Sequence, residues 1–438
     1  MLPLSERQKL GKKLREKVKR ISQADWSVKK AKRDPVALIV AANENRLRNL
    51  VPIKMGRMSA APFAFFRGAA PLMAADLATL PTTGLEVQIC GDAHVRNLGA
   101  YAAPEGHLLF DINDFDETVP GPWEWDLKRL ATSLVLAGQE AGEPNSGCRE
   151  SVEEMALSYR TSINRFAAMA ISELAKVEVV RGAKGTPVHA VLHKASRATP
   201  KETLKKLATP HPRLGHRFHD QPPVLRHVDT KMRNKVIESL RTYRNTVPLS
   251  HRWMLEAYEP VDVAFKIVGT GSVGTRDYVV LLFGNGSQDP LMIQVKEELP
   301  SCYAPYLRHL PPTKHEGRRV MEGQQKMQTA VDPLLGYTTI DGRDFLVRQL
   351  CDHKASIDLT DLKGTALREY ALVSGQLLAK AHARTGDAGA IDGYCGSSPK
   401  LDNAIGKFAK AYAEQTASDF EQFKKAIRKG RVRAVLGK

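Results

Sequence analysis

The chain has 438 residues, of which 42% are hydrophobic, and it carries a formal net charge of +17. No apolar run reaches the roughly 18 residues that a membrane span needs, and the first residues lack the apolar core of a secretory signal. The five cysteines are scattered without a CxxC pair, which argues against structural zinc and favours a reducing cytoplasm.

The positive charge lies in two segments. Residues 1–33 hold 12 Lys and Arg against 3 Asp and Glu, and residues 181–245 hold 15 against 4, so the rest of the chain sums to −3. Either these segments attract an anionic partner, such as a phosphate, a nucleic acid or an anionic lipid, or they are solvated helical surfaces. The sequence contains no recognisable nucleic-acid-binding motif.

The N-terminal part is typical of helices. A basic helix is predicted over residues 5–33 and a second helix over 36–50, after a proline break. The segment 57–68 is an aromatic cluster bracketed by two arginines. Either Arg67 faces the phosphate of a ligand, or the cluster is core with its arginines at the edge. A further helix is predicted over 69–80.

An acid-rich stretch organises the rest of the chain. It begins with the short apolar run 87–90, which is typical of a buried strand, and continues into the loop 91–97. A hairpin is predicted next, with arms at 98–101 and 108–112 that are joined by turn residues. The second arm runs into the acidic sequence NDFDE at 113–117.

The spacing of the polar residues in this stretch suits phosphoryl transfer. Asp92 and Asn97 stand in a D-x-x-x-x-N arrangement, and Asp114 and Asp116 follow one hairpin later. The reaction needs a carboxylate that orients or deprotonates the attacking hydroxyl, and hard oxygen ligands that hold Mg²⁺ against the nucleotide phosphates. We therefore expect Asp92 to be the base and Asn97 and Asp114 to be metal ligands. Asp116 is a third ligand or a supporting acid.

The alternative is that these residues only make two tight turns around a hairpin, because Asp, Asn and Gly are ordinary turn residues. The density of acids favours the chemical interpretation. Carboxylates this close repel one another unless a cation or a basic partner lies among them. The four acids within seven residues are Asp111, Asp114, Asp116 and Glu117.

Helices follow the acid-rich stretch. Asp126 lies in the first turn before the predicted helix 127–138, where it can cap backbone N–H groups or reach back to the loop 91–97. An amphipathic helix is predicted over 150–179. The basic segment 181–245 is predicted to be a partly ordered insertion plus a helix, and its histidines show no metal-binding spacing.

A second chemical pattern lies at 261–298. A Rossmann fingerprint would place a helix directly after its glycines, but the next residues, 278–283, are apolar and β-branched, and a third strand ends at Lys296. A glycine loop between strands, with a lysine on the third strand, is the phosphate-covering hairpin of kinases. A plain meander is the alternative. The loop residues expected to hold the nucleotide are Gly269, Gly271, Ser272 and Gly274.

A helix predicted over 314–331 offers a partner for this lysine. Glu322 is the candidate for an ion pair that fixes Lys296, with Glu316 as its competitor and a plain surface glutamate as the alternative. A strand at 344–350 suits the segment that joins two lobes. Further helices are predicted over 365–384 and 401–430.

The acid-rich stretch resembles the aminoglycoside phosphotransferase and choline kinase branch of the kinase-like superfamily. In that branch a Gly-Asp-x-His-x-x-Asn loop precedes a strand end that carries an Asp, and a helix with an early Asp follows. The matching residues here are Gly91, Asp92, His94, Asn97, Asp114 and Asp126. The resemblance implies that His94 belongs to the catalytic loop. The chain departs from the pattern at Cys90, where that branch usually has a histidine.

Almost the full length of the chain is also identified as a member of a bacterial family known as domain of unknown function 2252. The runs that carry this resemblance include SAAPFAFFRGAA, CGDAHVRN, FDINDFDETVPGPWEWDLKRLA, VGTGSVGTR, QVKEE, RRVMEGQQKMQ and LAKAHARTGD. The family has no established activity.

The two chemical patterns stand in the reverse of the usual kinase order, because the glycine loop follows the catalytic loop. We therefore predict an α+β, two-lobed protein-kinase-like fold that is circularly permuted, with extra helices and a basic insertion. The expected regions are a basic helical segment at 1–56, a catalytic region at 57–260 with the insertion 181–245, a nucleotide-binding β region at 261–352, and C-terminal helices at 353–438 that pack on the catalytic region.

The expected function is an ATP- and Mg²⁺-dependent phosphotransferase that acts on a hydroxyl of a small-molecule acceptor. That choice of acceptor rests on analogy with the phosphotransferase branch. Within the same fold, a nucleotide-binding pseudokinase or a nucleotidyl transferase remains an alternative. A third class is a basic protein that binds nucleic acid through residues 1–33 and 181–245.

Overall fold

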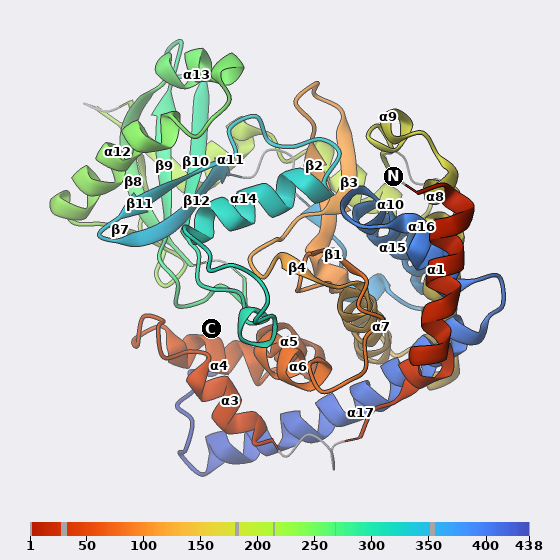
Figure 1. The fold of residues 1–438 in the computed structure, drawn as a ribbon. Coiled ribbons are helices and arrows are strands. Elements are labelled where there is room, and N and C mark those ends of the chain that lie inside the picture. The colour runs from red at the N-terminus through yellow and green to blue at the C-terminus, as the bar shows by residue number, and fades with distance from the viewer. Residues whose placement is uncertain are drawn as a thin grey trace.

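The computed structural model of the chain describes residues 2–27, 33–179, 184–212, 215–267, 269–350 and 355–437. Helices and strands are both abundant, so the prediction of an α+β fold is confirmed. Figure 1 shows a large sheet at one end of the molecule, helices at the other, and a few short strands between them. None of the described helices is long and apolar enough to cross a membrane.

The large sheet is antiparallel, in the order β11-β12-β10-β9-β8-β7. Its strands are β7 (Leu225–His227), β8 (Glu259–Lys266), β9 (Asp277–Phe283), β10 (Pro290–Glu297), β11 (Gly336–Ile340) and β12 (Arg343–Gln349). Both faces are covered. Because side chains alternate along a strand, Val280 of β9 packs in one cluster with α12 (Thr230–Arg244), whereas Val279 packs on the other face with α11 (Pro200–Leu207). The strands predicted around the glycine loop are confirmed.

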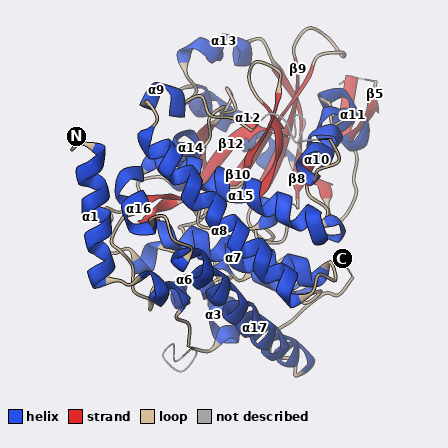
Figure 2. Ribbon diagram, turned by 90° about the vertical axis from the view of Figure 1, so that its right-hand side faces the viewer, coloured by secondary structure: helices blue, strands red, loops and turns tan. Residues whose placement is uncertain are grey.

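The helical body is built around α7 (Trp123–Glu140), whose residues are buried on every side from Trp123 to Gly138. A helix that is buried all round must lie inside the molecule. Figure 2 shows the long helices of the body packed against one another on the far side of the sheet. The surrounding helices are α1 (Leu4–Lys17), α8 (Asn145–Ala168), α9 (Ile171–Leu174), α15 (Gly364–Thr385), α16 (Ala388–Cys395) and α17 (Lys400–Arg428).

Short strands join the two ends of the molecule. The predicted hairpin is confirmed as β2 (Leu98–Ala102) and β3 (Leu108–Ile112), with β13 (Ala355–Ser356) on the outer side of β2. The strand predicted before the loop is β1 (Glu86–Ile89), and it pairs with β4 (Val119–Pro122). This antiparallel pair brings the two ends of the acid-rich stretch together.

The C-terminal end of α15 lies directly against β1, although the two are separated by almost 300 residues of chain. The backbone N–H of Gln88 donates to the Thr385 hydroxyl at 3.2 Å. Gly386 has no room for a side chain, because a Cβ there would lie 2.6 Å from a methyl carbon of Val87. A helix that comes late in the sequence therefore leads in space to the first strand of the acid-rich stretch.

The N-terminal helices are shorter than predicted. The basic helix expected over 5–33 ends at Lys17 and is followed by a 3₁₀ turn, while residues 28–32 lie outside the described part. The segment 57–68 contributes to α4 and α5, and its phenylalanines are core, as one of the two interpretations held. The elements here are η1 (Arg20–Ala24), α3 (Pro35–Ala41), α4 (Val51–Met58), α5 (Pro62–Gly68) and α6 (Ala70–Leu77).

The basic insertion is more regular than predicted. Beyond its helix α12 it forms two further helices and a β-hairpin, and its last strand, β7, extends the large sheet. The predicted helix 150–179 stops at Ala168, where Met169 adopts an extended backbone. The remaining elements are α10 (Pro187–Ser196), β5 (Ala208–His211), β6 (Gly215–Phe218), α13 (Leu249–Glu256), α14 (Glu316–Met327) and the 3₁₀ turns η2 (Val95–Asn97), η3 (Ala304–Tyr306) and η4 (Leu359–Asp361).

Candidate active site

The two chemical halves of the sequence meet at one ion pair. Lys296, near the end of β10, contacts both carboxylate oxygens of Asp116, a residue 180 positions earlier. The Ser272 hydroxyl of the glycine loop donates to the same carboxylate at 3.3 Å. Lys296 is only 3% exposed, and Asp116 and Glu298 raise its pKa above the usual value even though burial opposes this. The lysine is therefore a fixed positive charge between the sheet and the acid-rich stretch.

The loop that carries Asp92 is shaped by α7. The carboxylate of Asp126 accepts hydrogen bonds from the backbone N–H groups of Cys90 at 2.7 Å and Gly91 at 2.9 Å, so it reaches back to the loop, one of the two roles expected for it. Gly91 has a φ of +79°, and a Cβ there would lie 2.5 Å from the Glu117 carbonyl oxygen. Only glycine fits this position, and the turn directs Asp92 towards the site.

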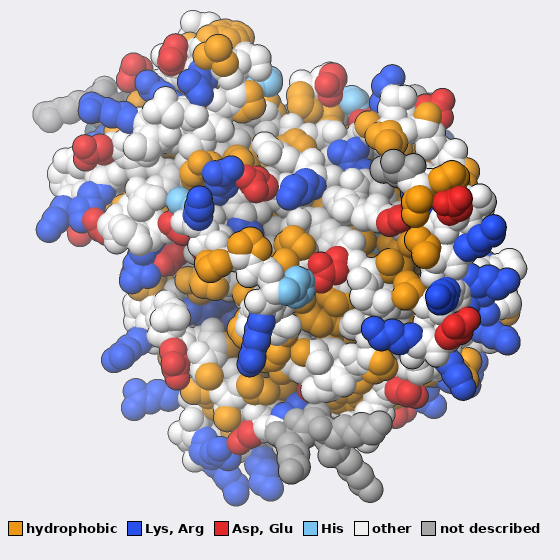
Figure 3. All heavy atoms as spheres, viewed as in Figure 1, with side chains coloured by type: hydrophobic (Ala, Val, Ile, Leu, Met, Phe, Trp, Pro, Cys, Tyr) orange, Lys and Arg blue, Asp and Glu red, His pale blue; other side chains and the backbone are white. Residues whose placement is uncertain are grey.

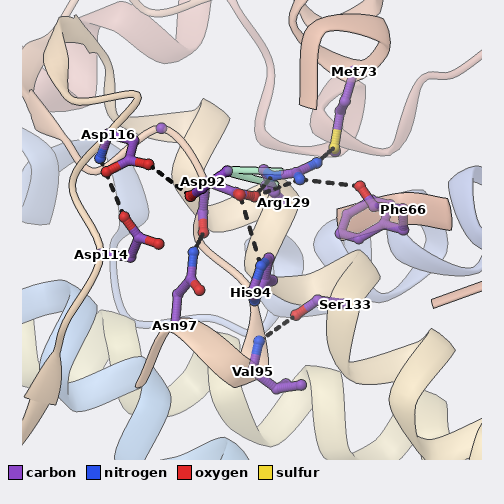
Figure 4. A network of polar contacts seen from close by, with 12 residues as sticks. Phe66, Met73, Asp92, His94, Val95, Asn97, Asp114, Asp116, Arg129 and Ser133 are labelled. Carbon is purple, nitrogen blue, oxygen red and sulfur yellow. Dashed lines mark hydrogen bonds and ion pairs between the residues drawn. The ribbon is translucent and has the colours of Figure 1, made fainter. Parts of the chain in front are cut away.

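Asp92 is held by an arginine that the sequence prediction missed. The Arg129 Nε donates to the carboxylate at 2.7 Å, and the Arg129 side chain is fully buried in α7. Burial alone would raise the pKa of Asp92, but the charge of Arg129 outweighs it and the pKa is lowered. Figure 4 shows this pair beside His94. Asp92 thus stays ionised and is a weak base that is well placed to orient a hydroxyl. This contact could have been found from the sequence, because Arg129 lies one helical turn after Asp126 and therefore on the same side of the helix.

His94 lies beside Asp92 in the interior of the protein. Its Nε2 lies 3.6 Å from the Asp92 carboxylate, and its side chain is almost completely buried. Burial lowers the pKa of His94 to about 3, so the ring is neutral near pH 7. The place of His94 beside Asp92 fits a positioning role, and its assignment to the catalytic residues stays a prediction.

The cluster of acids predicted from the sequence is largely neutralised by partners within the chain. Asp111 pairs with Lys380 of α15, and Asp116 pairs with Lys296. Glu117 accepts a hydrogen bond from the backbone N–H of Cys302 at 2.7 Å. Within the described ranges, Asp114 has no ion pair within 4 Å. It accepts a hydrogen bond from the Asp116 N–H at 3.3 Å, and the charges of Lys296 and Arg348 act on it from farther away. Asp114 is therefore the least closely neutralised of the four acids.

The raised pKa of Asp114 agrees with this weak neutralisation. Burial and the neighbouring Asp116 raise the pKa of Asp114 to about 6, so its charge is poorly compensated. Asn97 lies nearby (Figure 4), and its Nδ2 donates to the Asp92 carbonyl oxygen at 2.9 Å. This hydrogen bond leaves the amide oxygen of Asn97 as the end of the side chain that can bind a metal.

These residues fit a nucleotide-bound Mg²⁺ better than a metal bound by protein alone. No group of three or more His, Cys, Asp and Glu side chains within the described ranges could hold a metal ion. Mg²⁺ beside nucleotide phosphates needs only one or two protein oxygens, because phosphates and waters complete its shell. Asn97 and Asp114 can supply them. Asp116 contacts Lys296 through both carboxylate oxygens, which fits the supporting role expected for it as one of two alternatives; its role as a third metal ligand stays a prediction.

The expected ion pair between Glu322 and Lys296 is not formed. Glu322 pairs with Arg318 at 2.6 Å on the exposed side of α14, and Glu316 pairs with Arg319. The helix turns Arg319 towards the site, where this side chain donates to the carbonyl oxygens of Thr118, Asp116 and Leu299. Sequence reasoning did not reveal which side of the helix faces inward.

Besides Asp116, the acid that lies close to Lys296 is Glu298, and not Glu322. Its carboxylate lies 3.7 Å from the lysine, and the residue is 2% exposed. Burial and Asp116 raise the pKa of Glu298 well above its usual value. A signal for this contact existed in the run QVKEE, since residues two apart on an extended chain point to the same side.

The glycine loop is held by the N-terminal segment. Gly269 and Gly274 have φ values of +61° and +96°, which favour glycine. The carbonyl oxygen of Val273 accepts a hydrogen bond from the Arg46 side chain at 2.9 Å, that of Gly274 from the Leu47 N–H at 2.7 Å, and that of Gly269 from the Arg57 side chain. A Cβ on Gly271 would have the Arg67 carbonyl oxygen as its nearest neighbour, at 3.9 Å. No pattern in the sequence indicates that residues 46–67 reach this loop.

Comparison with known proteins identifies a family but no activity. A model of the family described as "Uncharacterized protein conserved in bacteria (DUF2252)" matches residues 46–426. No curated protein and no solved structure matches the chain significantly. The matched range includes the acid-rich stretch, the glycine loop and the helices that hold them. The chain therefore belongs to the DUF2252 family.

Proposed function

We propose that the protein is an ATP- and Mg²⁺-dependent phosphotransferase that acts on a hydroxyl group of a small-molecule acceptor. The observation that carries the proposal is the contact between Lys296 of the glycine-loop hairpin and Asp116, one residue beyond the Asp-Phe pair 114–115. Lys296 also acts electrostatically on Asp114, the proposed metal-binding carboxylate two residues before Asp116, and a phosphate-binding lysine and such a carboxylate must share one site in this kind of enzyme. The two halves lie far apart in sequence, so a chance turn motif does not account for their meeting.

The proposal includes a permuted kinase-like arrangement of two lobes. The large sheet with its glycine loop corresponds to the nucleotide-binding lobe, and the α7 body to the catalytic lobe. The contact between Thr385 and Gln88 supports the permutation, because a helix late in the chain leads in space to the strand before the catalytic loop. A connection between close, surface-lying chain ends is what a circular permutation requires.

Each residue has a role in the proposed reaction. Lys296 and the glycine loop bind the phosphates of ATP, and Asn97 and Asp114 hold the Mg²⁺. When bound, the metal neutralises charge on the phosphates. Asp92 orients the acceptor hydroxyl, whose oxygen forms a bond to the γ-phosphorus while the bond from that phosphorus to the ADP oxygen breaks. The hydroxyl proton passes to Asp92 and from there to solvent. The weak basicity of Asp92 is adequate, because phosphoryl transfer relies on positioning and charge stabilisation more than on proton abstraction.

A test of the proposal is the thermal unfolding of the full chain with ATP, with Mg²⁺ and with both. We expect a stabilisation that needs both ligands, of roughly 2.7 kcal/mol at about 100 times the Kd. The variants Lys296→Ala and Asp114→Asn should lose it. Glu322→Gln should keep it and serves as the control, since Glu322 lies on the exposed side of α14. A stabilisation that survives in Asp114→Asn, or one that is absent in the wild type, would contradict the proposal.

A nucleotide-binding module without transfer activity is the second candidate. The observation that favours it is the Arg129 side chain, which holds Asp92 and lowers its basicity. The two candidates differ in turnover, so ADP release in the presence of a panel of hydroxyl compounds separates them. A nucleic-acid-binding role has less support, because the sequence contains no recognisable nucleic-acid-binding motif. On the face in Figure 3 the Lys and Arg side chains are interspersed with acidic ones.

A further inference from the structure

A cavity of about 580 Å³ lies between α1, α8 and α16, outside the candidate active site. Figures 1 and 2 show α1 and α16 side by side, at an edge of the molecule away from the large sheet. Every residue that lines the cavity is polar, charged or a glycine, and none belongs to the acid-rich stretch or to the glycine loop. The volume is that of a small-molecule site, and a lining without apolar side chains suits a strongly polar ligand.

The face of α1 that lines this cavity is basic. It consists of Ser5, Gln8, Lys9, Lys12 and Arg15. Residues at these intervals lie on one side of a helix, one above the other. Part of the positive charge of the N-terminal segment is therefore directed towards a cavity, and it is not only a solvated helical surface.

The cations around the cavity outnumber the acids. Arg160 of α8 lies 2.8 Å from a carboxylate oxygen of α17, so its charge is matched. Lys9, Lys12 and Arg15 have no ion-pair partner within 4 Å in the part of the chain that the structure describes. Among the residues that line the cavity, Asp392 is the one acid. Three unmatched cations face one acid, which leaves two positive charges for an anion from outside.

Arg15 is held in a fixed orientation at the end of α16. Its Nε donates to the carbonyl oxygen of Tyr394 at 2.9 Å, and its Nη2 donates to that of Gly393. Gly396 has a φ of +63° and no room for a Cβ beside the Arg15 guanidinium. The remaining nitrogen, Nη1, makes no hydrogen bond within the described ranges. Arg15 is therefore a positioned cation with a donor left for a ligand.

Two amides provide hydrogen-bond acceptors beside these cations. The Nε2 of Gln8 donates to one oxygen of Asp392 at 2.7 Å, and the Nδ2 of Asn164 donates to the other at 3.1 Å. These contacts fix the orientation of both amides and leave each carbonyl oxygen without a partner among the described residues. Asn164 is exposed and Gln8 is half-buried, so hydroxyl groups of a ligand can reach both oxygens.

We propose that this cavity binds a phosphorylated polyol, such as a sugar phosphate, at a site separate from the candidate active site. The phosphate pairs with the three unmatched cations of α1, whose charge exceeds that of the acid by the two units of a phosphate monoester. The hydroxyl groups donate to the carbonyl oxygens of Gln8 and Asn164. A nucleobase or an acyl chain would find no apolar wall in this cavity.

The experiment is isothermal titration calorimetry of the full chain without nucleotide. The probes are glycerol 3-phosphate, ribose 5-phosphate and glucose 6-phosphate, and the reference ligands are inorganic phosphate and glucose. We expect at least one probe to bind roughly tenfold more tightly than inorganic phosphate, because its hydroxyl groups add two hydrogen bonds. Glucose should not bind, because it lacks the anion.

Two double variants on α1 test the location of the site. Lys9→Gln/Lys12→Gln should weaken binding of the probe by about tenfold or more, since hydrogen bonds to charged groups are lost. Lys13→Gln/Lys17→Gln is the matched control, because it removes the same charge from the same helix and neither lysine lines the cavity. All four lysines are exposed, so neither double variant should fail to fold.

The outcomes are decisive for the inference. It is overturned if no probe binds, if binding persists in Lys9→Gln/Lys12→Gln, or if the control variant loses binding to the same extent, since surface charge alone would then attract the probe. Inorganic phosphate that binds as tightly as the best probe would overturn the assignment to a polyol. Stabilisation by ATP and Mg²⁺ should be unchanged in both double variants, so this test and that of the proposed function fail independently.

Discussion

Two groups of buried charges on either side of the catalytic loop differ in how they are satisfied. Beneath the loop lies an anchored network of Asp111, Asp126, Lys380 and His382. Asp111 pairs with Lys380, Asp126 accepts two backbone hydrogen bonds, and the Tyr159 hydroxyl contacts the His382 ring at 2.8 Å. The second group, which we call the unpaired cluster, consists of Asp114 and Asp277. Neither has an ion pair within 4 Å in the described part of the chain, and the charges of Lys296 and Arg348 act on both from farther away.

This difference indicates which charged side chains stabilise the fold and which ones are available to a ligand. Buried polar groups in native proteins nearly always have partners, so a satisfied network stabilises the fold and an unsatisfied one calls for a ligand. Removing a member of the anchored network should therefore cost stability. Removing a member of the unpaired cluster should cost little or even stabilise the protein, while ligand binding is lost.

The largest effect is expected at Lys380. The change Lys380→Met leaves Asp111 buried without its cation, and breaking a buried pair in this way costs about 3–5 kcal/mol. Urea denaturation of the variant measures this free energy of unfolding. In the double variant Lys380→Met/Asp111→Leu the loss should be largely restored. A double variant as unstable as the single one would show that the pair is not what makes Lys380 important.

The next largest effect is a dependence of stability on pH that comes from Asp277. This residue is 3% exposed, and its Oδ1 has no hydrogen-bond partner in the described part of the chain. Burial raises its pKa from 3.8 to about 6. Between these values the folded protein keeps the proton and the unfolded chain loses it, so the free energy of unfolding falls as pH rises. At one pKa unit per 1.36 kcal/mol, the contribution lost above pH 6 is ~2–3 kcal/mol.

The variant Asp277→Asn checks this contribution. It removes the titrating group and keeps a side chain of the same shape, so the difference in stability between variant and wild type should grow as pH rises from about 4 to about 7. Chemical denaturation across that range measures the difference. A constant difference would mean that Asp277 has an ordinary pKa in the folded protein.

A smaller effect is expected for Asp114→Asn. This substitution relieves the repulsion from Asp116, so the ligand-free protein should gain about 1 kcal/mol near pH 7, a figure reduced for partial exposure. The Mg²⁺-dependent stabilisation by ATP should disappear in the same variant. If the ligand-free variant were markedly less stable than the wild type, Asp114 would belong with the anchored network and not with the unpaired cluster.

The smallest effect is expected for Glu322→Gln. Exposed ion pairs one helical turn apart contribute little, so neither the melting temperature nor the response to ATP and Mg²⁺ should change measurably. Loss of the nucleotide response in this variant would restore Glu322 as the partner of Lys296 in the ligand-bound protein.

Local patterns were sufficient to predict most of the strands. The alternation and turn residues of 98–112 correctly specify the hairpin, and the glycine loop with apolar runs on either side specifies β8 to β10. The first-turn position of Asp126 predicted its backbone contacts. These features depend on neighbours in the chain, which a single sequence displays.

The charge partners could not be predicted in the same way. Whether Lys296 meets Asp114 or Asp116 depends on the path of a loop, and whether Glu322 or Arg319 faces the site depends on the rotation of α14. Arg46 and Arg57 reach the glycine loop from a segment that has no chemical motif. Long-range pairing is fixed by tertiary packing, and no spacing in the sequence encodes it.

The seam between α15 and β1 has a consequence for how the gene could be rearranged. Gly386 follows a helix whose end already lies against Val87 and Gln88. In a rearranged gene, a short linker between codons 386 and 86 would be enough to connect the end of α15 directly to β1 in one polypeptide. New chain ends could then be placed at the start of β8, at the exposed residue Glu259. The linear order of the coding segments is therefore separable from the three-dimensional arrangement that they produce.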